Sequence, residues 1–246
     1  MSVDRLWVTD LTVNRNVRDM RPLPLAIGRF ERVTDVPPLA DDEIHVWLLV
    51  IPGTPTPREV ATASRAFLER KLMHYAKLDR VPEIARGEHG KPYAPALPDL
   101  DFNLSHARDH VLVAFARGQP LGVDIERIDR KLALEDLARR FFAAEEADAL
   151  DRIDVAERLP AFLRIWTCKE AVLKAIGQGL SFGLDRVVFT LGTGGVPAGL
   201  RHLADEAGVP EDWQIALMEP ADGFVGALAW NGTPRRIRAF LADIDA

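Results

Sequence analysis

The stretch WTCKEAVLKAIGQGL, residues 166–180, has the pattern of a helix with one buried face. Successive residues of a helix lie about 100° apart, which gathers most of its apolar side chains into one broad arc. Gly177 and Gly179 then end the helix, as glycine commonly does at a C-terminus. Lys169 falls inside the apolar arc, while Glu170 and Lys174 sit together at its edge.

The Glu170–Lys174 pair has a simple interpretation as a surface ion pair. Glutamate followed by lysine four residues later is the favoured orientation on a helix. That interpretation does not account for Lys169, which shares the apolar face. The helix is therefore also a candidate for carrying functional charges.

The composition is that of a globular protein. The chain has 246 residues, of which 48% are hydrophobic and 28% charged, enough for one large domain or two small ones. Its single cysteine, Cys168, excludes internal disulfides and cysteine-based zinc clusters, and favours a reducing cytoplasm. The formal net charge of −6 argues against a general nucleic-acid binder, which needs a basic surplus.

Neither a membrane span nor a secretory signal is expected. The longest apolar runs, such as VLVAFA, are far too short to cross a bilayer. The opening stretch MSVDRLWVTDLTVNRNVRDM contains acidic residues and no continuous apolar core. We therefore expect a cytoplasmic protein without membrane or nucleic-acid partners.

The order of expected elements predicts an α+β fold with two halves of similar plan. IHVWLLVI (44–51) is typical of a strand that is apolar on both faces, and a helix follows with Thr56 as N-cap and Pro57 in its first turn. The later expected elements are strands in DFNLS, VLVAFA and LGVDIERI, helices at about 133–149 and 158–176, and closing strands in LDRVVFTL, WQIALM and GFVGALAW.

Three segments are expected along the chain. Residues 1–43 form an N-terminal extension of uncertain order, 44–120 the N-terminal half, and 121–246 the C-terminal half with the metal site.

Acidic residues on the strand GVDIERI point to a metal ion. Alternation places Asp124 and Glu126 on one face of the strand, where like charges repel unless a cation or proton intervenes. With Glu170 as a third carboxylate, they make the hard oxygen set that Mg²⁺ prefers. The alternative is a half-buried strand whose polar face meets water.

Basic and hydroxyl residues upstream suit a phosphate ligand. Lys91 lies in a Gly-Lys-Pro turn, and Ser105 and His106 follow a short strand. Each residue alone is weak support, and nothing marks Ser105 as a nucleophile of the GxSxG type. With Lys169 and Lys174 they balance the three carboxylates and would suit a pyrophosphate.

Four blocks of the sequence together resemble the 4'-phosphopantetheinyl transferases of the larger, Sfp type. The blocks are HGKPYAPALPDLDFNLSHA, PLGVDIERI, ARRFFAAEEADAL and WTCKEAVLKAIGQGL. They occur in the order and at the spacing of that family and cover most of residues 87–192. The pattern W-x-x-K-E-x-x-x-K-x-x-G-x-G-L matches at every fixed position.

The resemblance implies a monomer of two pseudo-symmetric halves with coenzyme A bound in the cleft between them. Such enzymes move the phosphopantetheine arm of coenzyme A onto a serine of an acyl or peptidyl carrier protein and release adenosine 3',5'-bisphosphate. By the same resemblance, Asp124, Glu126 and Glu170 would hold Mg²⁺, and Glu170 would be the general base. Glu146 matches a family carboxylate near the metal.

The basic residues take their expected roles from the resemblance as well. Lys174 and His106 would neutralise the pyrophosphate oxygens. Lys91 and Ser105 would anchor the coenzyme A phosphates, with Lys169 lining the same pocket.

Two other functions stay open for the sequence. One is a Mg²⁺-dependent hydrolase of nucleotide pyrophosphates, which would deliver water in place of a serine. The other is a non-catalytic protein that binds carrier proteins. The acidic cluster argues against the second, since a binding module has no need of it.

Overall fold

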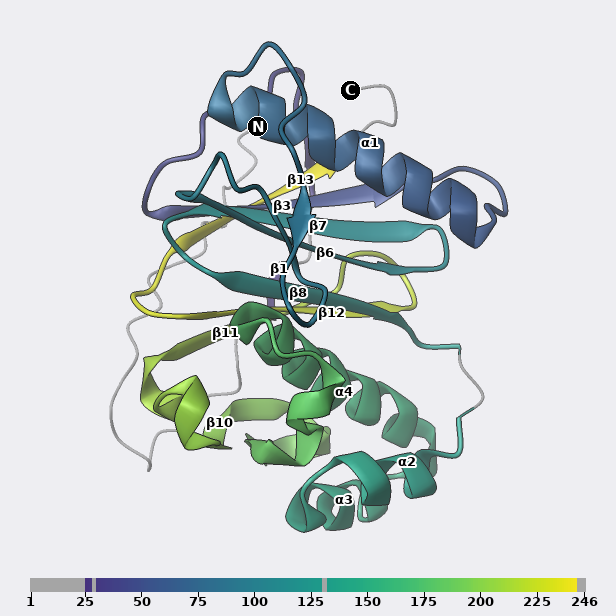
Figure 1. Cartoon of the computed structure of the whole chain (residues 1–246). Coiled ribbons are helices and arrows are strands. Elements are labelled where there is room, and N and C mark those ends of the chain that lie inside the picture. Colours follow the sequence, from purple (N-terminus) through teal and green to yellow (C-terminus); the bar gives the residue numbers. More distant parts are fainter. Residues whose placement is uncertain (1–24, 28–29, 130–131, 243–246) are drawn as a thin grey trace, which may run out of the picture.

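A computed structural model describes residues 25–27, 30–129 and 132–242 (Figure 1). Two main sheets have the strand orders β2-β13-β3-β7-β6 and β1-β11-β12-β8. Their strands are β1 (Leu25–Ile27), β2 (Glu31–Arg32), β3 (Glu43–Val50), β6 (Leu100–Ala107), β7 (His110–Arg117), β8 (Leu121–Arg127), β11 (Trp213–Met218), β12 (Phe224–Asn231) and β13 (Arg236–Ala242). Two small sheets pair β4 (Ala85–Arg86) with β5 (Pro92–Tyr93) and β9 (Val187–Leu191) with β10 (Pro197–Leu203).

Helices α1 and α4 cover the outer faces of the two main sheets, and α2 and α3 pack beside α4. The α-helices are α1 (Pro57–Ala76), α2 (Leu134–Phe141), α3 (Ala144–Asp151) and α4 (Val155–Ile176). Short 3-10 turns are η1 (Leu180–Phe182), η2 (Leu184–Arg186), η3 (Thr193–Gly195), η4 (Asp205–Ala207) and η5 (Pro210–Asp212). The predicted α+β class is confirmed.

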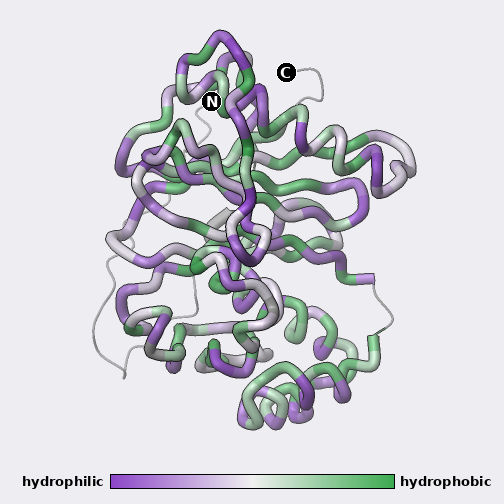
Figure 2. Tube along the Cα trace, viewed as in Figure 1, coloured by the Kyte–Doolittle hydropathy of each residue, from purple (hydrophilic) through white to green (hydrophobic). Residues whose placement is uncertain are grey.

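The main elements stack in four layers. Figure 1 shows α1, the sheet that contains β3, the sheet that contains β8, and α4 in succession. One apolar core fills the space between the two sheets, a second lies under α1, and a third lies under α4. Hydrophobic segments follow the central strands, and hydrophilic ones gather mostly at the ends of the elements (Figure 2).

The two halves repeat one topology, as the sequence predicts. In the first half, β3 pairs antiparallel with β7, and β7 pairs antiparallel with β6. In the second half, β8 pairs antiparallel with β12, and β12 with β11. A helix, α1 or α4, follows the first strand of each set and covers its sheet. In this repeat β8 corresponds to β3 and β6 corresponds to β11, so the edge strands β6 and β8 are not equivalent.

Helix α1 begins and ends through local chemistry. The Thr56 side chain accepts a hydrogen bond from the Glu59 amide, and the Glu59 carboxylate accepts one from the Thr56 amide, which forms a capping box. Pro57 at the first helical position needs no hydrogen-bond acceptor. The predicted roles of Thr56 and Pro57 are confirmed.

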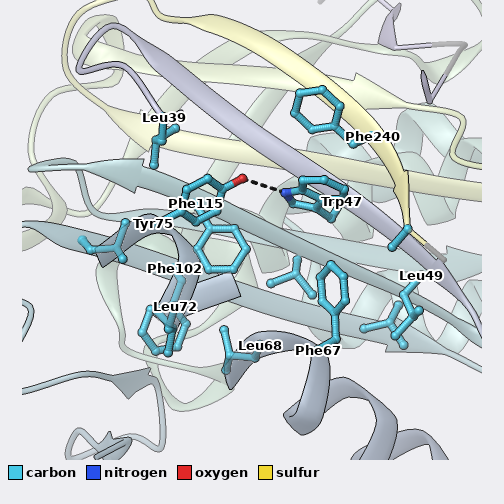
Figure 3. Packing of buried hydrophobic residues seen from close by; sticks show 14 of the residues in the cluster. Leu39, Trp47, Leu49, Phe67, Leu68, Leu72, Tyr75, Phe102, Phe115 and Phe240 are labelled. Carbon is cyan, nitrogen blue, oxygen red and sulfur yellow. Dashed lines mark hydrogen bonds between the residues drawn. The ribbon is translucent and has the colours of Figure 1, made fainter. Parts of the chain in front are cut away.

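Aromatic side chains fill the core beneath α1 (Figure 3). Trp47 from β3 meets Phe67 from the helix at a ring-centroid distance of 5.9 Å. The Trp47 indole N–H donates to the Tyr75 hydroxyl over 2.9 Å, so both polar atoms are satisfied within the core. This packing fixes α1 on β3, a strand whose residues are buried on both faces as predicted.

The second half differs in detail from its prediction. The helical stretch at 133–149 is broken into α2 and α3 at Phe142 and Ala143, both of which have extended backbone. Helix α4 begins at Val155, earlier than predicted, and continues through Pro160. It ends at Gly177, whose φ of 75° is the left-handed cap that glycine favours.

Segments at both ends of the described chain cross between the halves. Strand β13 pairs in parallel with β3, so the C-terminal strand belongs to the sheet of the N-terminal half. Strand β1 extends the other sheet beside β11. The expectation for residues 1–43 mostly concerns residues outside the described part, but β1 and β2 show that residues within 25–43 join both sheets. The division proposed at 120 and 121 stays a prediction, and β13 shows that the sheet containing β3 also includes residues from beyond 121.

A glycine sets the distance between β8 and α4. A Cβ atom on Gly122 would lie well inside van der Waals contact of the Ala171 carbonyl oxygen and the Ala175 amide nitrogen. We expect Gly122→Ala to lower the free energy of unfolding by about 1–3 kcal/mol, because helix and strand must separate. Urea denaturation measures this loss.

Gly199 on β10 provides the matched control. A Cβ atom there would have no neighbour within 4 Å. Gly199→Ala should therefore leave stability nearly unchanged, and an equal loss in both variants would contradict the close approach at Gly122.

Candidate active site

The candidate site lies where β8, β6 and α4 meet. The odd-numbered residues of β8, such as Val123 and Ile125, face the core between the sheets. Alternation turns Asp124 and Glu126 toward the helix side. Gly122 lets α4 approach that face closely, which brings Glu170 and Lys174 beside the strand.

A lysine, a serine and an aspartate form the centre of the site. The Lys174 ammonium donates to Asp124 Oδ1 over 2.6 Å, to the Ser105 hydroxyl over 2.8 Å and to the Val123 carbonyl over 3.2 Å. The Ser105 hydroxyl in turn donates to Asp124 Oδ1 over 2.7 Å. These contacts join residues from both halves, since Ser105 belongs to β6.

Glu170 is held in an environment that disfavours its charge. Burial, followed by the charges of Asp124 and Glu126, raises the pKa of Glu170 to about 7, and Lys174 only partly opposes the rise. The charges of Asp124 and Glu126 therefore both act on Glu170, whereas the predicted use of the three carboxylates as a metal site stays a prediction. A carboxyl group with a pKa near neutrality is suited to accept a proton.

The donor chemistry of this cluster fits a divalent cation. Asp124 Oδ2 is buried and has no hydrogen-bond partner among the described residues. An orphaned carboxylate oxygen is costly unless an ion or another ligand satisfies it. Within the described part of the chain, however, no three acidic, histidine or cysteine side chains form a preassembled metal group. At Asp124 Oδ1 the positive charge is supplied by the Lys174 ammonium and not by a metal ion.

Lys169 does not join this cluster. Its side chain is fully buried, and its ammonium donates to Glu146 Oε2 over 2.6 Å, to the Leu184 carbonyl over 2.8 Å and to the Val187 carbonyl. These contacts use all three of its protons. The expectation that Lys169 lines a coenzyme A pocket is therefore replaced by a structural role.

Glu146 compensates the charge of the buried Lys169 ammonium. It is 1% exposed, and its Oε1 accepts the Phe189 amide over 2.8 Å. Burial lowers the pKa of Lys169, while the Glu146 carboxylate opposes that effect. The pair ties α3, α4 and β9 together, which fixes the rotation of α4 next to Glu170.

Lys91 lies on the boundary between the halves. Its ammonium donates to the carbonyls of Leu121 over 3.0 Å and Ala175 over 2.9 Å, which leaves one of its three protons for another acceptor. Burial lowers the pKa of Lys91 to about 8. The turn that contains Lys91 is thus attached to β8 and to the end of α4.

His106 is next to Ser105 but points elsewhere. Ser105 faces β8, so alternation along β6 turns the exposed His106 to the opposite face of the strand. The structure therefore does not bring His106 into the central cluster.

Asn103 is a site residue that the sequence analysis missed. It is 3% exposed on β6, and its Oδ1 accepts the Val123 amide over 2.9 Å. An asparagine in the middle of the expected strand DFNLS was the available signal, because buried polar side chains require partners.

The pKa of Glu170 predicts an unusual pH dependence of stability. Its folded-state pKa of about 7 exceeds the ordinary 4.5, so the folded parent chain loses stability as pH rises from the lower value to the higher. In metal-free buffer at pH 8, Glu170→Gln should therefore be more stable than the parent by about 2–3 kcal/mol.

Urea denaturation at two pH values checks this expectation. Near pH 5 most of the difference should disappear, because the parent carboxyl group is then protonated in the folded state. A difference of the same size at both pH values would show that the effect does not come from ionisation.

The fold and the cluster define an α+β protein of two repeated halves with a charged site at their boundary. The profile of the 4'-phosphopantetheinyl transferase superfamily matches residues 120–218. The chain is 32% identical to the 4'-phosphopantetheinyl transferase HetI of Nostoc sp. over 184 residues, which cover 72% of this chain and 73% of HetI. The chain therefore belongs to the 4'-phosphopantetheinyl transferase superfamily.

Other relatives match over shorter regions. The transferase Sfp of Bacillus subtilis is 43% identical over 98 residues, or 40% of this chain and 42% of Sfp. AcpT of Escherichia coli is 38% identical over 121 residues, or 49% and 58%. The match thus spans less than half of Sfp. A holo-ACP-synthase structure from Plasmodium yoelii aligns with a TM-score of 0.34 and 14% identity over 46% of this chain and 94% of the other.

Proposed function

We propose that this protein transfers the 4'-phosphopantetheine group of coenzyme A to a serine hydroxyl of an acyl or peptidyl carrier protein in a Mg²⁺-dependent reaction. The serine oxygen attacks the phosphorus that bears the pantetheine arm. The bond from that phosphorus to the bridging oxygen breaks, and adenosine 3',5'-bisphosphate leaves with the electron pair. The serine proton passes to a base on the enzyme.

Glu170 is the proposed base. Burial next to Asp124 and Glu126 makes its carboxylate more basic than an ordinary glutamate, which favours proton uptake from a hydroxyl group. Lys174, which contacts Asp124 and Ser105, would supply a fixed positive charge for the pyrophosphate oxygens. Phosphoryl transfer needs little covalent help, so such alignment and charge supply most of the catalysis.

Asp124, Glu126 and Glu170 are the residues proposed to hold Mg²⁺. The ion, when bound, would stabilise charge on the phosphate oxygens. The orphaned Oδ2 of Asp124 supports its assignment as a ligand. The positive charge of Lys174 would then balance negative charge on the phosphates as well as on Asp124.

Residues from the first half are proposed to bind the coenzyme A phosphates. Lys91 has one further proton to offer, and the Ser105 hydroxyl already lies within the cluster. His106 is exposed on the other face of β6 and would reach only a phosphate that extends around this strand edge. Lys169 is left out of this set because its protons are used inside the protein.

One observation carries the proposal most directly. Side chains from the two halves converge on Asp124, with Lys174 arriving from α4 and Ser105 from β6, beside a glutamate whose pKa is near neutrality. A base, a fixed cation and metal donors gathered in one place are the groups that a phosphoryl-transfer site would use. Membership of the superfamily then favours phosphopantetheine as the transferred group.

The destination of the pantetheine arm tests this assignment. Coenzyme A labelled in its pantetheine portion should leave its label on an apo carrier protein, at the carrier serine. Label released as free phosphopantetheine, with none on the carrier, would replace the transferase by a pyrophosphate hydrolase.

The cellular setting is also a proposal. Within the described part of the chain, no helix combines the length and apolar character required to cross a bilayer. The only cysteine, Cys168, is buried, and burial raises the pKa of its thiol. The buried thiol and the proposed substrates suit a reducing cytoplasm, and the family resemblance extends the proposal to a monomeric enzyme that serves secondary metabolite biosynthesis.

Asp124→Asn should weaken metal dependence and turnover together. The change keeps the size of the side chain but removes the charge that faces Lys174 and Glu170. We expect the maximal rate to fall by about tenfold or more, with a higher Mg²⁺ concentration for half-maximal rate. A Mg²⁺ titration of the transfer rate measures both effects.

Asp148→Asn is the matched control, since Asp148 is exposed and pairs with Arg139 at the surface. That variant should titrate like the parent. An unchanged Mg²⁺ titration in Asp124→Asn would remove Asp124 from the metal site.

A further inference from the structure

Besides sharing the core between their sheets, the two halves contact each other at the edge strands β6 and β8, which form no ladder with each other within the described residues. Strand β8 ends one sheet and β6 ends the other. Among the described strands, none pairs with the open edge of β8, so its backbone amides and carbonyls need other partners. Side chains satisfy several of these groups instead.

Three side chains cover the open edge of β8 next to Asp124. Asn103 Oδ1 accepts the Val123 amide over 2.9 Å, and the Val123 carbonyl accepts from Lys174 over 3.2 Å. The Leu121 carbonyl accepts from Lys91 over 3.0 Å. Asn103 is the one of these three without charge, and it is almost completely buried.

Asn103 and Ser105 act as neighbouring contacts from one face of β6. They are two residues apart, so both side chains point to the same side of the strand. Asn103 holds the backbone of Val123, and Ser105 binds the carboxylate of the next residue, Asp124. Two contacts from one half thus fix both the backbone and the side chain of the acidic strand in the other half.

We infer that Asn103 is a positioning residue: it holds β8 of the second half against β6 of the first, so that Asp124 and Lys174 stay aligned with groups bound by the first half. The inference deepens the proposed function and rests on it for the catalytic consequence. Without the Asn103 acceptor, the buried Val123 amide loses its partner and β8 can move relative to Ser105. Small displacements at a reacting centre reduce turnover more than ground-state binding.

Asn103→Leu removes the acceptor and keeps a side chain of similar volume. Gln119→Leu is the matched control, because Gln119 is also a buried amide whose Nε2 donates to a backbone carbonyl, that of Asn231, over 2.6 Å. Asn103→Leu loses one side-chain hydrogen bond and Gln119→Leu loses two, to the carbonyls of Asn231 and Pro120, but only the first variant removes the partner of the Val123 amide.

Hydrogen exchange of the intact protein gives a readout that is independent of activity. In the parent chain the Val123 amide should be protected, although no described strand pairs with that edge. In Asn103→Leu we expect exchange in residues 121–127 to accelerate by about tenfold or more, while Gln119→Leu leaves this segment as in the parent. Steady-state transfer to an apo carrier protein should show kcat reduced by about ten- to a hundredfold, with a much smaller change in KM for coenzyme A.

The outcomes separate the inference from the proposed function. A fast-exchanging Val123 amide in the parent overturns the inference even if Asn103→Leu fails to fold. The same holds if kcat in Asn103→Leu equals that in Gln119→Leu at matched stability. A parent chain that transfers nothing to any carrier overturns the proposed function. In that case hydrogen exchange in β8 is the only measurement that decides whether Asn103 positions this strand.

Discussion

Lys169→Met is expected to lower the free energy of unfolding by about 3–5 kcal/mol, because it leaves a buried carboxylate without its partner. Glu146 is 1% exposed, so water cannot solvate its carboxylate in place of the lost ammonium. The carbonyls of Leu184 and Val187 lose their donor as well. Urea denaturation followed by far-ultraviolet circular dichroism measures the effect.

Two further variants show whether the buried charge is the cause. Adding Glu146→Gln to Lys169→Met removes that charge and keeps an oxygen for the Phe189 amide, so part of the stability should return. Lys77→Met replaces an exposed lysine and should change stability by less than about 0.5 kcal/mol. A double variant as unstable as Lys169→Met would place the cost in packing instead of charge.

Glu170→Gln is expected to lower the transfer rate by roughly 10²- to 10⁴-fold, the range of a general base. Glutamine keeps the shape of the side chain but cannot take up the serine proton. The fold should remain intact, because at neutral pH and above the substitution removes an unfavourable buried charge. Single-turnover transfer to an apo carrier protein, measured at saturating coenzyme A, isolates the chemical step.

Glu206→Gln makes the same chemical change at an exposed position and should transfer at the parent rate. Coenzyme A should still bind to Glu170→Gln, which calorimetry can verify. If Glu170→Gln transferred at near the parent rate, Glu170 would not be the base, and the serine proton would have to leave by another route.

The sequence predicted the elements that depend on local chemistry. A few neighbouring residues determine each of these features. They are the apolar run of β3, the capping residues Thr56 and Pro57 of α1, and the glycine that ends α4. The proximity of Asp124 and Glu170 was also predictable, because strand alternation and helix spacing limit where their side chains point. The class of fold followed from the order of these elements.

Long-range partners were outside the reach of such reasoning. Lys169 was recognised as unexplained, but its partner Glu146 is 23 residues away and belongs to a different helix. The same limit applies to Asn103, whose partner Val123 lies on the edge strand of the other sheet. Periodicity identifies a buried polar residue, whereas only the packed fold identifies what satisfies it.

Sheet membership was the other feature that local patterns did not determine. Strand β13 carries arginines on its partly exposed positions and lies in the second half of the sequence, yet it pairs in parallel with β3. A parallel partner far along the chain leaves no turn signal between the two strands. The repeat was therefore predictable, while the strand that crosses back to the first half was not.

Intact-mass spectrometry of an apo carrier protein shows whether this protein transfers phosphopantetheine. The carrier is incubated with this protein, coenzyme A and Mg²⁺, and a parallel sample contains EDTA. We expect a mass gain of one phosphopantetheine group on the carrier serine, and EDTA should abolish it. An unmodified carrier, in a sample where the coenzyme A has been cleaved, would contradict it.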